Sequence, residues 1–275
     1  MRVTINQLQE MKNCGEKISM ITAYDYTSGK LLEEVGIPII LVGDSLGQVI
    51  LGYDSTIPVT MADMIHHTKA VVRGTEKSHI VADLPFLTYQ ASIDDALYNA
   101  GRLLKEGGAQ SVKVEGGQKI AKTVSQMVDI GIPVMGHIGL TPQSVNQLGG
   151  YKVQGKTSDS AAELIEDAKA LENAGVYALV LESIPIPLGK LITEQITIPT
   201  IGIGAGVHCD GQVQVFHDLL GLFTDFTPRH ARQYSKLNEI IKTAVSSYID
   251  EVKTGDFPSK RESFDVNDNI LKELT

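Results

Sequence analysis

Apolar residues along this chain form short runs that alternate with longer amphipathic segments. Ile18–Tyr24 and Pro38–Asp44 are apolar almost throughout, which is typical of parallel strands buried on both faces. Six further runs of the same kind follow at residues 79–85, 111–115, 133–139, 177–183, 199–204 and 212–216. The pattern therefore predicts eight strands.

Segments with helical spacing lie between most of these runs. Met61–Arg73 is preceded by Thr60, an N-cap residue, with Asp63 placed three positions later as in a capping box. Further helices are predicted at residues 4–13, 28–35, 92–107, 118–130, 161–174 and 229–249, the last one started by Pro228.

Eight apolar strands alternating with helices predict a (β/α)₈ barrel, with a doubly wound open sheet as the alternative. No linker or repeat marks a second domain, so we expect one barrel domain over residues 1–275. Residues 1–17 are expected to add an N-terminal helix that plugs the bottom of the barrel. Residues 255–275 are expected to be a C-terminal tail that covers the barrel, contacts another subunit or frays.

The composition excludes several classes of function. A net charge of −9, few aromatic residues and no tryptophan argue against a nucleic-acid partner. No window approaches eighteen uninterrupted apolar residues, so no membrane span is expected. Cys14 and Cys209 are too few for a disulfide framework, and the start of the chain lacks the apolar core of a signal peptide. We therefore expect a cytoplasmic protein.

Ionisable residues occur at the carboxyl ends of five consecutive predicted strands, which is the end that carries the active site in such barrels. They are Asp44, Asp83, Lys113 with Glu115, His137, and Glu182. Each alone could be a structural residue, since Asp44 could cap a turn and a lone histidine often belongs to a core. Five strand ends of this kind together indicate a site, because buried unpaired charges are costly.

The chemistry of these side chains predicts a metal and a reaction class. Asp44, Asp83 and Glu115 offer only oxygen ligands, which is the preference of Mg²⁺. Such a cation can polarise a 2-oxo acid, and Lys113 can add positive charge beside the enolate that forms. Glu182 can act as the base that removes the proton next to the ketone. Proton abstraction followed by carbon–carbon bond formation suits these groups.

Two further stretches are candidates for binding. Gly202, Gly204 and Gly206 end the seventh strand, where many barrels bind phosphate, although the glycines could equally serve tight packing. The long segment Leu140–Gly155 follows the fifth strand on the active face. We expect it to form a wall of a co-substrate pocket.

Long motifs of the chain resemble the ketopantoate hydroxymethyltransferase family over nearly the whole length. They include M-I-T-A-Y-D from Met20, V-G-D-S-L-G around Asp44, D-L-P-F at Asp83, V-K-V-E-G-G around Lys113 and G-H-I-G-L-T-P-Q-S from Gly136. The resemblance implies transfer of a one-carbon unit from 5,10-methylenetetrahydrofolate to 3-methyl-2-oxobutanoate, giving 2-dehydropantoate. It also implies a homodecamer, in which the N-terminal helix and the tail could contact partners.

The resemblance also implies a role for each candidate residue. Asp44 and Asp83 match the magnesium-binding aspartates of the family, and Glu115 matches its outer metal-site carboxylate. Ser45, Asp44, Asp83 and Lys113 match positions that hold the oxo acid, and His137 matches a histidine that lines the pocket. Glu182 matches the proton acceptor.

Two other functions remain open from the sequence. The first is a Mg²⁺-dependent lyase or mutase of the phosphoenolpyruvate/isocitrate lyase type, but the reactive-cysteine motif usual in the lyases is absent from this chain. The second is a barrel that binds without catalysis. The retained charges of Lys113, Glu115 and Glu182 argue against it.

Overall fold

The computed structural model describes residues 1–266 and residue 271. Its centre is a closed barrel of eight parallel strands in sequence order, with β1 pairing both β2 and β8. The predicted barrel is thereby confirmed, and the open sheet is not formed. The strands are β1 Ile18–Thr22, β2 Ile39–Val42, β3 His79–Asp83, β4 Ser111–Glu115, β5 Val134–Gly139, β6 Ala178–Glu182, β7 Thr200–Ile203 and β8 Gly211–Gln214.

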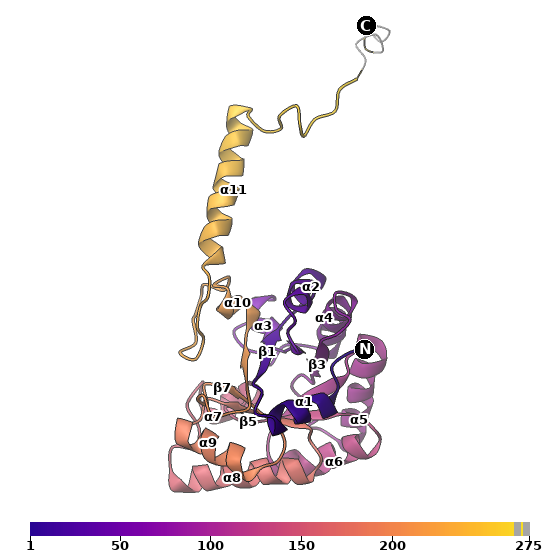
Figure 1. Ribbon diagram of the computed structural model, residues 1–275, viewed down its shortest axis with the longest axis vertical. Coiled ribbons are helices and arrows are strands. Elements are labelled where there is room, and N and C mark those ends of the chain that lie inside the picture. Colours follow the sequence, from indigo (N-terminus) through magenta and orange to yellow (C-terminus); the bar gives the residue numbers. More distant parts are fainter. Residues whose placement is uncertain (267–270, 272–275) are drawn as a thin grey trace.

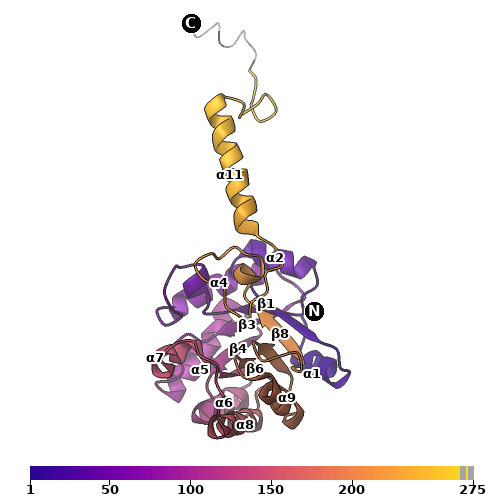
Figure 2. The same ribbon diagram turned by 90° about the vertical axis from the view of Figure 1, so that its left-hand side faces the viewer.

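Helices surround the barrel over most of its circumference (Figures 1 and 2). The longer ones before the C-terminal region are α1 Ile5–Asn13, α2 Tyr26–Glu34, α4 Met61–Arg73, α5 Ile93–Arg102, α6 Ala121–Asp129, α8 Ser158–Asn173 and α9 Ile186–Gln195. Short helical turns, α3 Leu46–Val49, α7 Val145–Leu148 and α10 Phe216–Leu219, follow strands β2, β5 and β8. A π-helical turn, η1 Leu103–Gly107, continues α5, and 3₁₀ turns η2 Gln118–Ile120 and η3 Pro142–Ser144 precede α6 and α7.

The hydrophobic core has two layers, as the alternation of strand side chains requires. One cluster fills the barrel interior and includes Met20, Ile39 and Val81, while the larger one lies between the strands and the helices. Leu8 of α1 is fully buried in the interior cluster. The N-terminal helix therefore plugs the barrel, as expected from the sequence.

Polar contacts fix the N-terminal segment at the bottom of the barrel. The Arg2 guanidinium donates to the backbone oxygens of Thr75 and Ser78 at 2.7 and 2.9 Å. His79 Nδ1 lies 3.0 Å from the oxygen of Val3, and Lys12 pairs with Asp210 at 2.9 Å. These bonds place the buried His79 imidazole on the side of the barrel away from the strand ends that carry the candidate site.

The last helix begins later than its sequence pattern predicted. Helix α11 covers Leu237–Thr254, whereas the prediction started it at Arg229 behind Pro228. Residues 228–236 instead form an irregular strap, and the backbone N–H of Tyr234 donates to the oxygen of Leu219 at 2.8 Å. Contacts with the end of the barrel thus replace the first two turns of the expected helix.

Helix α11 projects away from the barrel and covers none of its strands (Figures 1 and 2). None of its residues is buried. Its exposed apolar side chains are Ile240, Ile241, Val245, Tyr248, Ile249 and Val252. On the barrel, Ser19 of β1 and Gln212 of β8 are paired neighbours whose outward faces are exposed. Within residues 1–266 and residue 271, no long helix therefore occupies the position of the eighth barrel helix.

Two sequence expectations concern the remaining parts of the chain. In the region of the expected tail, residues 255–266 are mostly exposed, and residues 267–270 and 272–275 lie outside the described part of the chain. Among the described residues, no helix has the length and apolar character needed to cross a bilayer.

Candidate active site

The ionisable residues predicted from the strand ends meet at one end of the barrel. Asp83 and Lys113 are register partners on β3 and β4, and Glu115 and His137 are register partners on β4 and β5. Asp44 follows β2 directly, and Glu182 is the last residue of β6. All except Glu182 are buried, and the Glu182 side chain is 13% exposed.

Asp44 and Asp83 form the centre of the cluster. The backbone N–H of Asp44 donates to Oδ2 of Asp83 at 3.0 Å. Gln143 Nε2 donates to Oδ2 of Asp44 at 2.8 Å. Burial raises the pKa of Asp44, and the negative charge of Asp83 raises it further. Two neighbouring buried carboxylates therefore favour a cation between or beside them.

Lys113 is the cation that the chain itself supplies. Its Nζ lies 3.1 Å from Oδ1 of Asp83. Burial lowers the pKa of Lys113, but Asp83, Glu115 and Asp44 outweigh that effect and hold it above the ordinary lysine value. The ammonium group is therefore charged at any physiological pH, with donors available to a bound anion.

His137 connects Lys113 with Glu182. Nδ1 of His137 lies 3.3 Å from Lys113 Nζ, and Nε2 lies 3.2 Å from Oε2 of Glu182. An ammonium group can only donate, so Nδ1 must accept and Nε2 must carry the proton of the neutral ring. Burial and then the Lys113 charge lower the pKa of His137, which keeps the ring neutral. The imidazole thus faces Glu182 with an N–H.

The surroundings of Glu182 allow its carboxylate to accept a proton from a substrate. The His137 Nε2 atom makes no well-aligned hydrogen bond despite its short distance to Glu182. Ser183, the next residue, has a positive φ of 48°. Two hydrogen bonds fix its backbone, because its N–H donates to the backbone oxygen of Ile203 and its own oxygen accepts from the backbone N–H of Gln154. A strained but fixed backbone positions the carboxylate that precedes it.

Two residues that contact the cluster, Gln143 and Tyr89, were not predicted from the sequence. Gln143 is buried, and besides holding Asp44 it donates from its backbone N–H to Oε2 of Glu115 at 2.9 Å. Its Oε1 accepts from the Tyr89 hydroxyl at 2.8 Å. Gln143 belongs to the motif G-H-I-G-L-T-P-Q-S that begins at Gly136, so the sequence held a signal for it. Tyr89 carried no such signal, because it lies in the irregular segment after β3.

Glu115 has a different environment from the two aspartates. Its backbone N–H donates to the Tyr89 hydroxyl, and its Oε1 is 3.6 Å from His137 Nδ1, which is beyond hydrogen-bond distance. Burial raises the pKa of Glu115 well above its usual range, and Lys113 offsets this only in part. Gln143 thus links the Glu115 carboxylate to Asp44, and this indirect link fits an outer position of Glu115 at a metal site centred on Asp44 and Asp83.

Ser45 lies beside Asp44 with its hydroxyl 2.9 Å from that of Tyr24. Tyr24 is buried, and burial raises its pKa above the usual range. The phenol therefore remains protonated and can orient Ser45. Among the described residues, the hydroxyl of Ser45 pairs with that of Tyr24 and with no histidine, which fits binding rather than nucleophilic attack.

The chemistry of these residues fits a hard divalent cation. The Oδ1 atom of Asp83 is buried without a well-aligned hydrogen bond, and both aspartates present oxygen donors. Within residues 1–266 and residue 271, no three His, Cys, Asp or Glu side chains converge as a complete metal cluster. Mg²⁺ commonly takes one or two carboxylates and fills its remaining positions with water and substrate. Asp44 and Asp83 suit that ligand number.

The glycines after β7 are explained by packing. A Cβ at Gly204 would approach Cβ of His230 to 3.0 Å, and one at Gly206 would approach the Ile186 side chain to 2.7 Å. Both have positive φ angles, 66° and 91°. Close approach of the strap and of α9 therefore accounts for them without a phosphate.

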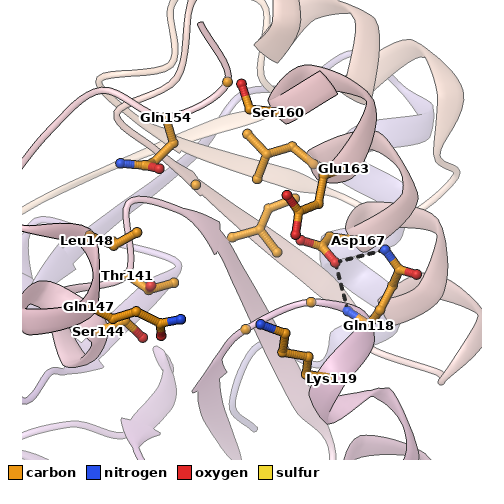
Figure 3. A pocket seen from close by; sticks show the side chains of 16 residues that line it. Gln118, Lys119, Thr141, Ser144, Gln147, Leu148, Gln154, Ser160, Glu163 and Asp167 are labelled. Carbon is orange, nitrogen blue, oxygen red and sulfur yellow. Dashed lines mark hydrogen bonds between the residues drawn. The ribbon is translucent and has the colours of Figure 1, made fainter. Parts of the chain in front are cut away.

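A cavity of about 440 Å³ lies next to the strand ends β4 and β5, and its lining begins at Gly116, directly after Glu115, without including a side chain of the cluster (Figure 3). It lies between the loop after β4, the segment after β5 and helix α8. Thr141, Ser144, Gln147 and Leu148 come from one side, and Ser160, Glu163 and Asp167 come from α8 on another. The segment 140–155, expected from the sequence to wall a co-substrate pocket, provides much of the lining.

Comparison of the structure with solved proteins shows the same fold at low sequence identity. A phosphonopyruvate hydrolase matches with a TM-score of 0.64 and 12% identity, covering 99% of this chain and 94% of that one. A 2,3-dimethylmalate lyase matches with a TM-score of 0.58 and 15% identity, covering 100% and 95%. At this level of sequence identity, these similarities show that the barrel fold is shared and nothing further.

Sequence comparison is more specific. A relative from Dehalococcoides mccartyi, a 3-methyl-2-oxobutanoate hydroxymethyltransferase, is 60% identical over 100% of this chain and 97% of its own length. A protein of the same name from Carboxydothermus hydrogenoformans is 59% identical over 99% of both chains. The profile described as ketopantoate hydroxymethyltransferase matches residues 2–260. This chain belongs to the ketopantoate hydroxymethyltransferase family.

Proposed function

We propose that the protein transfers a hydroxymethyl unit from 5,10-methylenetetrahydrofolate to 3-methyl-2-oxobutanoate and so forms 2-dehydropantoate for pantothenate biosynthesis. The observation that carries the proposal is the connected series Asp83, Lys113, His137 and Glu182 at the mouth of the barrel. It places a fixed cation and a separate carboxylate within one site, as enolate chemistry requires.

Three members of the series and Ser45 have roles in proton abstraction. Glu182 takes the proton from C3 of the oxo acid, and the electron pair of that C–H bond forms the enolate. Lys113 balances the negative charge that develops on the ketone oxygen. The Nε2 atom of His137, 3.2 Å from Oε2 of Glu182, places the polar N–H of the ring beside the carboxylate, and Ser45 orients the substrate carboxylate.

Asp44 and Asp83 would hold Mg²⁺ as the inner carboxylates, with Glu115 in the outer position. When bound, the ion supplies Lewis-acid polarisation of the oxo acid. Mg²⁺ is present with oxalate in a crystal structure of phosphonopyruvate hydrolase, a protein with the same fold (TM-score 0.62, 13% identity). The oxygen-only donor set of this chain supports the same choice of metal.

Carbon–carbon bond formation completes the transfer. The enolate carbon bonds to the methylene carbon of the folate as one of the two bonds from that carbon to folate nitrogen breaks, and water then replaces the second nitrogen and supplies the hydroxyl oxygen. The proton taken from C3 and one proton of water end on the two folate nitrogens. Tetrahydrofolate leaves. The buried, closely hydrogen-bonded walls formed by Gln143 and Tyr89 limit access of water to the proton-transfer step.

Helix α11 supports assembly into a homo-oligomer, a homodecamer by family resemblance. In the part of the chain that the structure describes, nothing covers its apolar side chains, and no helix covers the outward faces of β1 and β8. Helix α11 of a second copy suits that vacant position, since an apolar helix face exposed over several turns is unfavourable in water.

The absence of a disulfide framework supports a cytoplasmic location.

Hydrogen exchange at C3 of the oxo acid tests the chemistry without folate. Asp83→Ala should abolish Mg²⁺-dependent exchange, whereas full exchange in that variant would remove Asp83 from the metal site. Glu182→Gln should bind the oxo acid but not exchange its proton. Undiminished exchange there would exclude Glu182 as the base. Glu166→Gln, on the outer part of α8, is the matched control and should exchange normally.

Formation of 2-dehydropantoate by the purified protein tests the transfer itself. Product should require both Mg²⁺ and 5,10-methylenetetrahydrofolate. Turnover of the oxo acid without folate would instead favour a lyase or mutase activity, the reaction type of several proteins that share the barrel. That alternative has support from the fold only.

A further inference from the structure

The cavity beside the cluster contains charged groups that no role described so far uses. Glu163 and Asp167 are four residues apart on α8, and both side chains line the cavity (Figure 3). Like charges at this spacing destabilise a helix. Asp167 is held by the backbone N–H of Gln118 at 2.8 Å, but Glu163 makes no hydrogen bond or ion pair within the described residues. Its carboxylate is thus available to a ligand.

The loop after β4 is shaped around this arrangement. A Cβ at Gly117 would overlap the carboxylate of Asp167, so only glycine leaves room for that side chain. Lys119 reaches the cavity from the same loop without pairing with either acid of α8 at ion-pair distance. Amides and hydroxyls from Gln147, Gln154 and Thr141 complete a polar lining above Ile138, Leu148 and Leu164.

This lining suits a flat, polar heterocycle with neighbouring N–H donors. A carboxylate can accept two parallel hydrogen bonds from an amidine-like edge, as it does from a guanidinium. The apolar residues contact the ring, and the volume lies within the range of small-molecule sites. The 2-amino-4-oxopyrimidine edge of a pterin has this donor pattern.

The cavity and the cluster are joined through the backbone, although no side chain of the cluster lines the cavity. Gly139, one of its lining residues, packs directly on the backbone oxygen of Glu182. The backbone N–H of Leu140 donates to that same oxygen at 2.8 Å. Gln143, which holds Asp44, lies between the lining residues Thr141 and Ser144. A ring bound here therefore shares a wall with the metal cluster.

We propose that Glu163 binds the pterin ring of the folate co-substrate in this cavity, by accepting hydrogen bonds from its ring N–H and its 2-amino group. The inference rests on the proposed function, because it assigns a subsite for the one-carbon donor. Glu163 contacts the pyrimidine edge of the pterin, on the opposite side from N5, which holds the reacting carbon together with N10, so its contribution is to binding of the donor.

Direct binding measurements test the assignment. Calorimetry with tetrahydrofolate should show Glu163→Gln to bind at least tenfold more weakly than the unmodified protein. p-Aminobenzoylglutamate, which lacks the pterin, should bind both proteins equally. Glu166→Gln introduces the same change on the same helix outside the cavity, and it should bind tetrahydrofolate normally. Thermal unfolding checks that both variants are folded.

The other results contradict the proposal in distinguishable ways. If the unmodified protein binds tetrahydrofolate and Glu163→Gln binds it equally well, the subsite is wrong and the proposed function stands. Equal weakening for tetrahydrofolate and p-aminobenzoylglutamate would place Glu163 at the tail of the folate and overturn the pterin assignment. Absence of tetrahydrofolate binding by the unmodified protein would overturn both proposals.

Discussion

Nζ of Lys113 lies 3.3 Å from Nδ1 of His137, and this single contact determines which ring nitrogen carries the proton. The ammonium donates, so Nδ1 accepts and Nε2–H faces Glu182. A lysine on β4 thereby sets the tautomer of a histidine on β5 whose N–H faces a carboxylate on β6.

Removal of the Lys113 charge should release this tautomer. In Lys113→Met, we expect both neutral tautomers of His137 and a higher pKa for the ring, because the lysine charge helps to lower it. Nitrogen-15 spectra of the imidazole report both changes. The rate of product formation should fall about 100-fold or more, as for loss of an oxyanion partner.

Lys119→Met is the matched control for that experiment. Lys119 is exposed on the loop after β4, so its replacement should leave the His137 spectrum unchanged. An unchanged spectrum in Lys113→Met as well would show that the tautomer has another origin.

Gln143→Leu should destabilise the protein. The change leaves Oδ2 of Asp44, the Leu84 oxygen and the Tyr89 hydroxyl without their present partner. Each buried polar group left unpaired costs about 1–3 kcal/mol, so the free energy of unfolding should fall by at least about 3 kcal/mol. Urea denaturation measures the loss. Gln147→Leu, in the partly exposed cavity wall, should change it by less than about 1 kcal/mol.

The stability of the protein should depend on pH through His79. Burial lowers the pKa of His79 to about 4, whereas an unfolded histidine titrates near 6.5. Between these values the unfolded chain binds the extra proton, so stability decreases as the pH falls from 6.5 toward 4. The contribution of this residue is about 3 kcal/mol.

Unfolding free energies measured from pH 7 to pH 4 in the natural protein and in His79→Gln test this dependence. The variant should start from a lower stability and show a shallower decline. Parallel curves would assign the acid sensitivity to other buried groups, of which His137, His217 and His230 also have lowered pKa values.

Two glycine substitutions should have opposite effects on stability. In Gly117→Ala, the added methyl group would overlap Asp167, and we expect the free energy of unfolding to fall by about 1–3 kcal/mol. Gly101 lies in α5 with open space around its Cβ position and an ordinary φ. Gly101→Ala should raise the stability by about 0.5–1 kcal/mol. Thermal unfolding of both variants checks the contrast, and a loss in both would contradict it.

Val245→Glu tests the role of α11 in assembly. The charge falls among exposed apolar side chains of the helix, so the variant should form smaller particles than the natural protein at equal concentration. Analytical ultracentrifugation gives the masses. Ser246→Glu places the same side chain one residue further on, among the polar positions of α11, and should preserve the assembly. Equal masses for all three proteins would exclude α11 as an interface.

The barrel was predictable because buried parallel strands consist of apolar residues whatever their neighbours are. The strand Ser111–Glu115 has the bounds that its pattern predicted. Others, such as β2, are shorter than predicted, since the apolar run continues into the loop that carries Asp44. Helix α9 was not defined by the pattern, because prolines at 185 and 187 resemble a turn although they start the helix.

The strap was not predictable in the same way. Pro228 is a favourable residue for a helix start, but contacts with Leu219 and Gly221 hold residues 228–236 in another conformation. Those contacts depend on tertiary packing and override local preference.

The charged part of the candidate site followed from the barrel, since strand ends converge in that fold. Lys113 and Glu115 were expected to face the same way, and both are buried in the cluster. Gln143 and Tyr89 lie in irregular segments, where the direction of a side chain depends on the path of the loop. Their contacts with Asp44 and Glu115 became visible only in three dimensions.

The positive φ of Ser183 limits how this protein can diverge in sequence. Glycine and asparagine adopt such a conformation at little cost, whereas valine, isoleucine and threonine do not. A library randomised at position 183 and selected for growth without pantothenate should therefore retain the small or flexible residues and lose the β-branched ones. The identity of the residue after the base is thus restricted by backbone conformation, even though its side chain takes no part in the proton transfer.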